Sequence, residues 1–416
     1  MNFSRPDGFY GSMLAAESII DGVTILHGPG GCRGLSAALS SRHVPREYRT
    51  VEGDFFFHRS RIPCTHVDID DYIYGASAKV GMVLDILKSD RFGFACILES
   101  PGASLIGDKL QDEVIQSGMS DKVAILGKCM MSETFATGYD AMLLRIAERL
   151  AVRKEKKSNV VNLVGLPFIA RGCFPLVAEL HRLLGMMGLT VNADIGMACT
   201  IQQMRDSGEA IVNVCICPEY FSDTAEYYES IGVPTVRGPL GAPIGYDAIR
   251  AWVLAVADAT GADPSAVMEY IDKEEKDVFR VLTASLGLGE FMRYRLFSVL
   301  AESSVALPLT RFMVKELKLM PRSVNLTEHD GDCEGKLKDI LERIHAVSAL
   351  ETEFGKDFAD VVFGPGSYGD YLKETEMCST NVDIFLPTKE KMDISPKSII
   401  GLDGCRRIVE YVMNSM

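Results

Sequence analysis

Basic side chains are in short supply in this sequence. Its 416 residues include 43 Lys and Arg against 57 Asp and Glu, which gives a formal net charge of −14. Such a surface repels phosphate backbones and offers no basic patch to anionic lipids, so we expect neither nucleic-acid nor membrane binding. No apolar stretch reaches the ~18 residues of a membrane span, and the N-terminus does not have the pattern of a signal peptide. We therefore expect a cytoplasmic protein.

Cysteine is the residue type that the sequence has in excess. Eleven cysteines are present, which is an odd number. Structural disulfides are rare in the cytosol, and an odd number of thiols cannot be fully paired. Metal ligands and buried apolar thiols remain as explanations. Burial alone accounts for most of the eleven, because free cysteine is among the most buried residue types.

Short β-rich runs alternate with longer helical patterns along the chain. The predicted strands cover residues 23–26, 95–98, 123–126, 160–164, 210–215, 360–363 and 382–386, and the clearest helices cover residues 141–152 and 176–187. Alternation of this kind predicts parallel sheets with crossover helices. The chain is also too long for one ordinary hydrophobic core.

Two interruptions divide this pattern. Residues 151–159 form a charged run without an apolar face, and a second break lies at residues 287–289. We predict an α/β protein of three Rossmann-like, doubly wound domains with parallel sheets, at residues 1–158, 159–290 and 291–416. The recurring strand–glycine–helix unit leaves open whether the three are copies of one plan.

The segment with the clearest chemical character is residues 26–34, Leu-His-Gly-Pro-Gly-Gly-Cys-Arg-Gly, between a predicted strand and a predicted helix. It is neither a P-loop nor a dinucleotide fingerprint. It places Cys32 at a helix N-terminus, where the dipole and free amides lower a thiol pKa. Glycines such as Gly31 let the backbone approach a bulky inorganic group closely. The same residues equally fit a tight turn with an incidental buried thiol.

A second cysteine, Cys64, follows a proline in the loop of residues 61–75. No Cys-x-x-Cys accompanies it, so a zinc knuckle is not indicated. His66 fits a loop cap better than a ligand. The aspartates at positions 68, 70 and 71 lack the glycine and terminal glutamate of an EF-hand and are expected to cap a helix.

In their order along the chain, these segments resemble the nitrogenase component 1 family. Its opening Pro-x-Gly and His-Gly-x-x-Gly-Cys motifs are matched by residues 6–8 and 27–32, and its second cysteine by Cys64. Further family motifs are matched at residues 70–76, 106–108, 137–140, 213–215, 232–234 and 401–404. The resemblance covers almost the whole chain.

This resemblance implies an iron–sulfur cluster at a subunit interface, held by Cys32 and Cys64. The family's third cluster cysteine is missing, and Cys96 nearby is expected to lie in the core. Cys129 falls near a serine that helps to ligate the double cluster in the nitrogenase β chain, which makes it the reserve ligand. Two thiolates from each of two chains complete a 4Fe-4S cluster. With Cys129 as a further ligand, the larger double cluster remains an alternative.

The resemblance also bears on the active-site side. Cys217 stands where the molybdenum–iron α chain carries its large cofactor, so it is a candidate cofactor contact or simply a thiol at a strand end. The position of the cofactor histidine holds Ile399–Ile400 instead. Dinitrogen reduction by this chain alone is therefore not expected. The glycine turn at residues 363–370 fits an anionic or tetrapyrrole substrate, and also a plain crossover turn.

The function that the resemblance implies is a subunit of a nitrogenase-like two-component reductase, an oxidoreductase. An ATP-hydrolysing iron protein would dock near Cys32 and Cys64 and pass electrons through the cluster, since this chain has no Walker motif of its own. The second chain at the cluster would be a copy of this one or a homologous sister. There are two alternatives. The chain could be a non-catalytic scaffold for cluster assembly, or it could be the partner of a sister chain that holds the active site.

Overall fold

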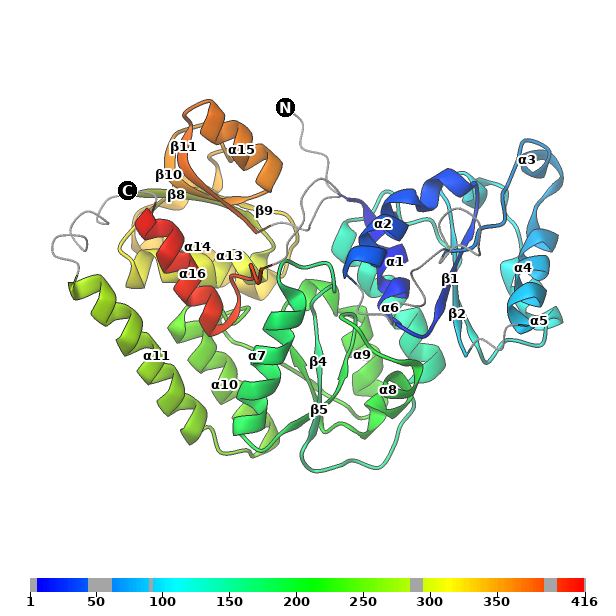
Figure 1. Ribbon diagram of the computed structural model, residues 1–416, viewed down its shortest axis with the longest axis horizontal. Coiled ribbons are helices and arrows are strands. Elements are labelled where there is room, and N and C mark those ends of the chain that lie inside the picture. The colour runs from blue at the N-terminus through cyan, green and yellow to red at the C-terminus, as the bar shows by residue number, and fades with distance from the viewer. Residues whose placement is uncertain (1–5, 44–61, 90–92, 285–294, 385–394, 415–416) are drawn as a thin grey trace.

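Three parallel sheets form the framework of the molecule (Figure 1). The computed structural model describes residues 6–43, 62–89, 93–284, 295–384 and 395–414. The strand orders are β1-β2-β3, β5-β4-β6-β7 and β11-β10-β8-β9. Their bounds are β1 Val23–His27, β2 Ala95–Glu99, β3 Val123–Leu126, β4 Val160–Val164, β5 Thr190–Asp194, β6 Val212–Cys215, β7 Thr235–Arg237, β8 Leu296–Ala301, β9 Met320–Leu326, β10 Ala359–Gly364 and β11 Cys378–Asp383.

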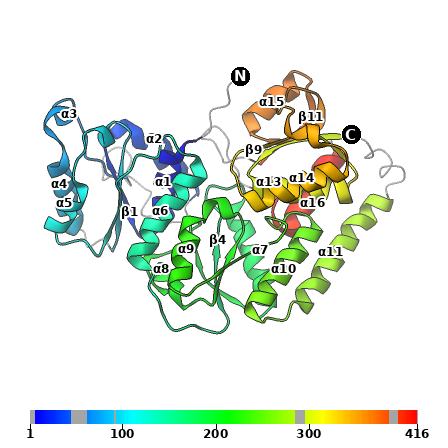
Figure 2. The same cartoon turned by 180° about the vertical axis from the view of Figure 1, so that it is seen from behind.

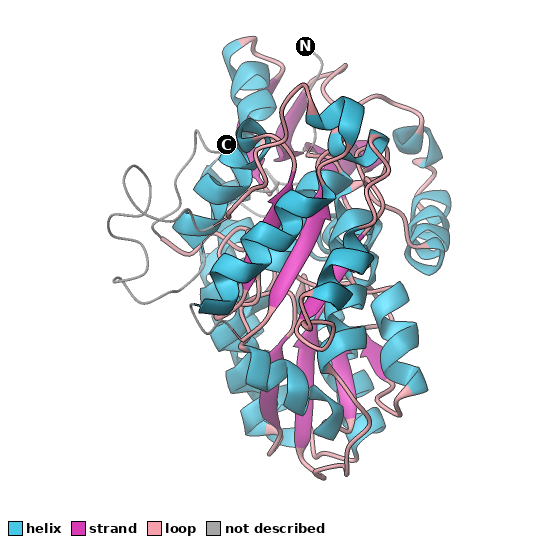
Figure 3. Ribbon diagram, turned by 90° about the vertical axis from the view of Figure 1, so that its right-hand side faces the viewer, coloured by secondary structure: helices cyan, strands magenta, loops and turns pink. Residues whose placement is uncertain are grey.

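Helices connect the strands and lie on both sides of the sheets (Figures 2 and 3). They are α1 Gly8–Glu17, α2 Gly34–His43, α3 Asp71–Tyr74, α4 Ser77–Ser89, α5 Leu110–Gln116, α6 Phe135–Leu150, α7 Cys173–Met186, α8 Ile201–Asp206, α9 Asp223–Ser230, α10 Tyr246–Thr260, α11 Ser265–Ala284, α13 Ser303–Arg311, α14 Gly331–Arg343, α15 Gly366–Glu374 and α16 Gly401–Asn414. The described part of the chain contains no helix both long and apolar enough to cross a membrane.

The second and third sheets share one strand order. In each sheet the first strand in sequence, β4 or β8, lies between the second and the third, and the fourth pairs with the third. The first sheet follows the same plan, because Leu26 of β1 forms an isolated parallel bridge to Cys64 on the side away from β2. The segment around Cys64 thus lies where the second strand in sequence, β5 or β9, lies in the other two sheets. The α/β prediction is confirmed, and its three units repeat one arrangement.

Most predicted strands agree with the structure to within two residues at either end. The last one is displaced: β11 covers Cys378–Asp383 and shares only residues 382–383 with the predicted strand 382–386, and residues 385–387 lie outside the described part of the chain. The strands β5, β7, β8 and β9 are absent from the prediction. The boundary at residues 158/159 stays a prediction, as does the one at 290/291, which also lies outside the described residues.

Alternating residues of β2 show why the first sheet is covered on both faces. Ala95 and Ile97 pack with α4 and α5, whereas Cys96 and Leu98 pack with α1 and α6. Strand residues point alternately to opposite faces, and a parallel sheet buried on both faces has continuous apolar strands. All five residues of β2 are buried. The predicted core position of Cys96 is confirmed.

Helix α1 crosses helix α6 at glycine contacts. A Cβ at Gly138 of α6 would overlap the backbone of Gly8, and a Cβ at Gly11 would overlap the carbonyl oxygen of Phe135. Two helix backbones can approach this closely only where side chains are absent. The contact places the start of α1 beside the loop after β3, where the Gly8 amide donates to the Glu133 carbonyl at 2.9 Å.

The C-terminal helix α16 contacts α7, α10 and α11 around the second sheet, although its residues fall in the range predicted for the third domain. Glu179 of α7 accepts a hydrogen bond from the Leu402 amide at 2.6 Å, at the first turn of α16. Arg406 forms an ion pair with Glu274 of α11. These contacts fix the segment just before α16 against the ends of the strands.

We expect Gly138→Ala to lower the free energy of unfolding by about 2 kcal/mol or more, because the added methyl group forces α1 and α6 apart. Gly335→Ala in α14 is the matched control, since a Cβ there meets no neighbour within 4 Å. Removing a helix-interior glycine at that exposed position is expected to stabilise by about 0.5–1 kcal/mol. Urea unfolding of both variants measures the difference, and equal effects would contradict the close helix contact.

Candidate functional site

Cys32 and Cys64 lie together at the carboxyl end of β1. Cys32 is in the 3-10 turn Gly30–Arg33, directly before α2. Cys64 sits on the bridge to β1, and both side chains join one small apolar cluster with Phe9 and Met13 of α1. A Cβ at Gly30 would lie 3.5 Å from the Cys64 sulfur. The fold therefore brings together the two cysteines that the sequence predicts as ligands.

A buried polar link joins the segments on either side of this thiol pair. His27, which is fully buried at the end of β1, contacts Thr65 through Nδ1 at 3.1 Å and Asp108 through Nε2 at 2.9 Å. The Thr65 hydroxyl also accepts from the Gly28 amide at 3.0 Å. Asp108 in turn accepts from the Ala76 amide at 3.1 Å. Residues of three separate sequence motifs thus meet behind the two cysteines.

The Cys32 thiol does not behave as the sequence predicts. Its pKa is raised, first by partial burial and second by the nearby charge of Cys64. The prediction of a lowered pKa at a helix N-terminus is therefore wrong for the chain alone. Cys32 lies in the turn before α2, and α2 begins only at Gly34. A thiol pair of this kind becomes doubly ionised when a metal centre supplies positive charge.

The surface around the thiol pair is open and partly apolar. A Cβ built on Gly31 meets nothing within 4 Å, and Gly31 is exposed. The segments that follow Cys64 and β2 along the chain expose large apolar side chains, with Ile73 of α3 69% exposed and Leu105 86% exposed. Asp68 accepts from the Asp70 and Asp71 amides, whereas the side chain of the N-cap residue of α3, Asp70, makes no capping hydrogen bond.

The other cysteines do not enlarge the thiol pair within the described residues. All eleven are free thiols. Among the described residues, no three His, Cys, Asp or Glu side chains are grouped so that they could hold a metal ion. Cys129 is partly exposed in the loop between β3 and α6, and its role as a further ligand stays a prediction. One chain alone therefore offers half of the four thiolates of a 4Fe-4S cluster.

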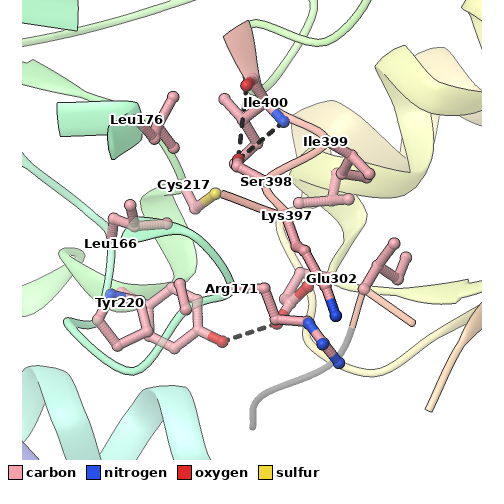
Figure 4. A pocket seen from close by; sticks show the side chains of 14 residues that line it. Leu166, Arg171, Leu176, Cys217, Tyr220, Glu302, Lys397, Ser398, Ile399 and Ile400 are labelled. Carbon is pink, nitrogen blue, oxygen red and sulfur yellow. Dashed lines mark hydrogen bonds between the residues drawn. The ribbon is translucent and has the colours of Figure 1, made fainter. Parts of the chain in front are cut away.

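A second candidate site is the cavity between the second and third sheets (Figure 4). It lies where the carboxyl ends of β4, β6, β8 and β11 meet the segment before α16. In open α/β sheets, ligands bind at the strand ends where the strand order reverses. Its lining includes Leu166, Arg171, Leu176, Cys217, Tyr220, Glu302, Ile384, Lys397, Ile399 and Ile400.

Cys217 lines this cavity just after β6, and its role as a cofactor contact stays a prediction. Gly165, with φ +81°, permits the approach, because a Cβ there would lie 2.6 Å from the Cys217 carbonyl oxygen. Burial raises the pKa of the Cys217 thiol well above its ordinary value, and the charge of Glu219 raises it further. Cys217 is therefore a neutral thiol in the chain alone. None of residues 363–370, the predicted substrate turn, lines the cavity.

An acid that the sequence does not reveal faces the same cavity. Glu302, the residue before α13, accepts a hydrogen bond of 2.7 Å from the Tyr220 hydroxyl. Burial raises the Glu302 pKa to about 6, the Tyr220 hydrogen bond lowers it, and the charges of Glu219 and Glu328 raise it. A single glutamate after an unpredicted strand has no motif around it. The strand β8 itself, rich in apolar residues, is the signal that could have located it.

Comparison with known proteins finds a family profile that matches nearly the whole chain. Residues 8–416 match the profile of the family described as Nitrogenase component 1 type Oxidoreductase. Two curated relatives are each one subunit of a light-independent protochlorophyllide reductase, from Halorhodospira halophila (strain DSM 244 / SL1) and from Methylobacterium sp. (strain 4-46). The first is 29% identical over 40% of this chain and 34% of its own length. The second is 33% identical over 33% of this chain and 26% of its own length.

Solved structures agree on the fold. A structure described as "Nitrogenase Cp1 at pH 6.5" aligns with a TM-score of 0.76 and 16% identity, over 100% of this chain and 94% of that one. A second, "Nitrogenase Cp1 at pH 5", has a TM-score of 0.69 and 14% identity, over 99% and 88% of the two chains. At these identities the likeness concerns the fold.

We expect Asp108→Ala to destabilise the protein by about 2–3 kcal/mol, because it removes the acceptor for buried His27 and for the Ala76 amide. Asp112→Ala, an exposed carboxylate in the first turn of α5, is the control and is expected to cost less than about 1 kcal/mol. Denaturant unfolding measures both. If the two variants lose equal stability, Asp108 does not hold the three motifs together.

Proposed function

The chain belongs to the nitrogenase component 1 type oxidoreductases, and from this premise we propose that it is the catalytic-component subunit of a two-component reductase. In this proposal an ATP-hydrolysing iron protein supplies electrons, and an interface iron–sulfur cluster on Cys32 and Cys64 receives them. A nitrogenase-like enzyme of this kind reduces a substrate bound elsewhere in the chain.

One observation carries the proposal: two cysteines from separate segments lie side by side at an open, partly apolar edge of the first sheet. The exposed Gly31 leaves room for a bulky group beside Cys32. Cys32 and Cys64 supply the thiolates, and the nearby backbone and Arg33 shape the rim. Arg33 is itself held by a 2.7 Å hydrogen bond to the Ile62 carbonyl. When bound, an iron–sulfur cluster accepts and passes single electrons.

The half-set of ligands implies a second chain. A two-fold axis beside Cys32 presents the same pair of thiols twice and so completes four ligands. Exposed apolar side chains on the segments that follow Cys64 and β2, namely Ile69, Ile73 and Leu105, would be covered by a partner. The second chain at the cluster can be either a second copy of this chain or a homologous sister chain. Cys129 remains the candidate for an added ligand if the cluster is larger.

The electron donor must be a separate protein. Residues 26–34 turn from strand to helix without the Gly-Lys-Ser/Thr of a P-loop, so nucleotide hydrolysis is assigned to the partner. We assign the substrate to the cavity at Cys217, because this cavity lies at the carboxyl ends of the strands, where ligands of open α/β sheets bind. The curated relatives are named for protochlorophyllide, and they share only part of their length with this chain. Turnover with an iron protein separates a reductase from an assembly scaffold.

We expect the anaerobically purified protein to be brown and to contain iron and acid-labile sulfide. Cys32→Ala and Cys64→Ala should each abolish the bound iron, because either change leaves a single thiolate per chain. Cys333→Ala is the matched control, since Cys333 is a buried thiol at the start of α14, away from the pair. Iron analysis and visible absorption measure the outcome. Colourless protein after reconstitution, or equal iron loss in all three variants, would contradict the assignment.

The second expectation concerns assembly. A cluster held by two thiolates is exposed to solvent and oxygen, so loaded protein should be a dimer or a larger oligomer. Light scattering on the anaerobic protein, combined with iron analysis of each fraction, measures this directly. The Cys32→Ala variant shows whether the association needs the cluster. A monomer that retains a full cluster would place further ligands within one chain and overturn the shared site.

A further inference from the structure

We propose that Glu302 is the proton donor to an unsaturated molecule bound in the cavity beside Cys217. This inference rests on the proposed reductase function, which it deepens by naming an acid at the substrate. Glu302 directly follows β8 at the carboxyl end of that strand. Its side chain lines the cavity together with Cys217 and Tyr220. Leu166, Leu176 and Ile399 supply apolar walls.

The geometry separates Glu302 from an ordinary surface carboxylate. The Tyr220 hydroxyl donates to its Oε1 at 2.7 Å, so Oε2 is the carboxyl oxygen that a ligand would meet. The polar ends of Arg171 and Lys397 point toward the same region of the cavity (Figure 4). Arg171 is engaged in an ion pair with Asp383. A carboxylic acid that lies between apolar side chains and a tyrosine hydroxyl is suited to donate a proton to a ligand rather than to bind a cation.

Two acidic neighbours favour the protonated form of Glu302. Glu219 and Glu328 face Glu302 from the η5 turn Pro218–Tyr220 and from the loop after β9, and both negative charges disfavour ionisation of Glu302. Glu219 does not line the cavity, and its Oε1 accepts from the Ser304 amide at 2.8 Å and from the Ser303 hydroxyl. With a pKa of about 6, Glu302 is largely protonated below pH 6 and loses its proton above it.

The reaction balances with Glu302 as the only acid. Reduction of one double bond takes up two electrons and two protons. The electrons come one at a time from the low-potential iron–sulfur protein of the proposed function. The Glu302 O–H bond breaks as a new bond from hydrogen to the substrate forms, and the carboxylate left behind takes a proton from water. A second transfer from the reprotonated acid completes the saturated product.

The test compares Glu302→Gln, Glu302→Asp and Tyr220→Phe in the full-length, cluster-loaded protein with its iron protein. Acetylene serves as the unsaturated probe, because the cavity has a free volume of only about 50 Å³. General acid catalysis is worth about 10²–10⁴-fold, so Glu302→Gln should lose that factor in turnover while its iron content and cluster reduction stay unchanged. Glu302→Asp should recover part of the rate. Turnover of the unaltered protein should fall as pH rises through about 6.

Tyr220→Phe tests the role of the hydrogen bond. That bond lowers the Glu302 pKa, so its loss should move the fall in turnover to higher pH without removing the acid. Infrared titration of the carboxylic acid band needs no partner protein and decides the case even if electron delivery fails. A band that ionises near pH 6 and is missing in Glu302→Gln supports the proposal. Ionisation near the ordinary value of about 4.3, or turnover of Glu302→Gln within twofold of the unaltered protein, overturns it.

Discussion

Parallel pairing is the constraint on which the rest of the structure depends. In a parallel sheet all strands end at the same edge, and each return crossing must run through a helix. The order found in the second and third sheets places the first strand between two neighbours, so the loops after the first and third strands diverge there. Cys217 follows β6 and Glu302 follows β8 at such ends. The same rule places Cys32 after β1, beside the bridged segment that carries Cys64.

Much of this arrangement could be predicted from local sequence. The strands β3 and β4 are found at the predicted residues, because continuous apolar runs bounded by glycine or a charged linker are typical of buried parallel strands. The two ligand cysteines were identifiable because glycine and proline frame them in motifs of fixed order. Two of the missed strands, β5 and β7, lack these signals. Thr190–Asp194 alternates polar and apolar residues, and Thr235–Arg237 is too short to show a period.

The features that could not be predicted depend on contacts between distant residues. The raised pKa of Cys32 follows from burial against α1 and from Cys64, neither of which is adjacent to it in the sequence. Burial raises the Glu302 pKa, and the hydrogen-bond donor to Glu302, Tyr220, lies 82 positions earlier in the chain. The displaced strand β11 has a similar cause. It pairs with β10 from Cys378 onward, whereas the apolar run that suggested a strand lies further along the chain. The residues that form a strand are decided by the strand with which they pair, and local sequence propensity does not reveal that partner.

The burial of the thiols gives the protein an unusual response to chemical labelling. Nine of the eleven cysteines are buried, and only Cys32 and Cys129 are partly exposed. Burial raises the pKa of Cys96, Cys173, Cys199, Cys215, Cys217, Cys333, Cys378 and Cys405. Protonated thiols within the core react slowly with maleimides, since the thiolate is the nucleophile. A fluorescent maleimide would therefore attach to the native chain at two positions, and the Cys32 fraction would report how far that edge of the sheet is covered.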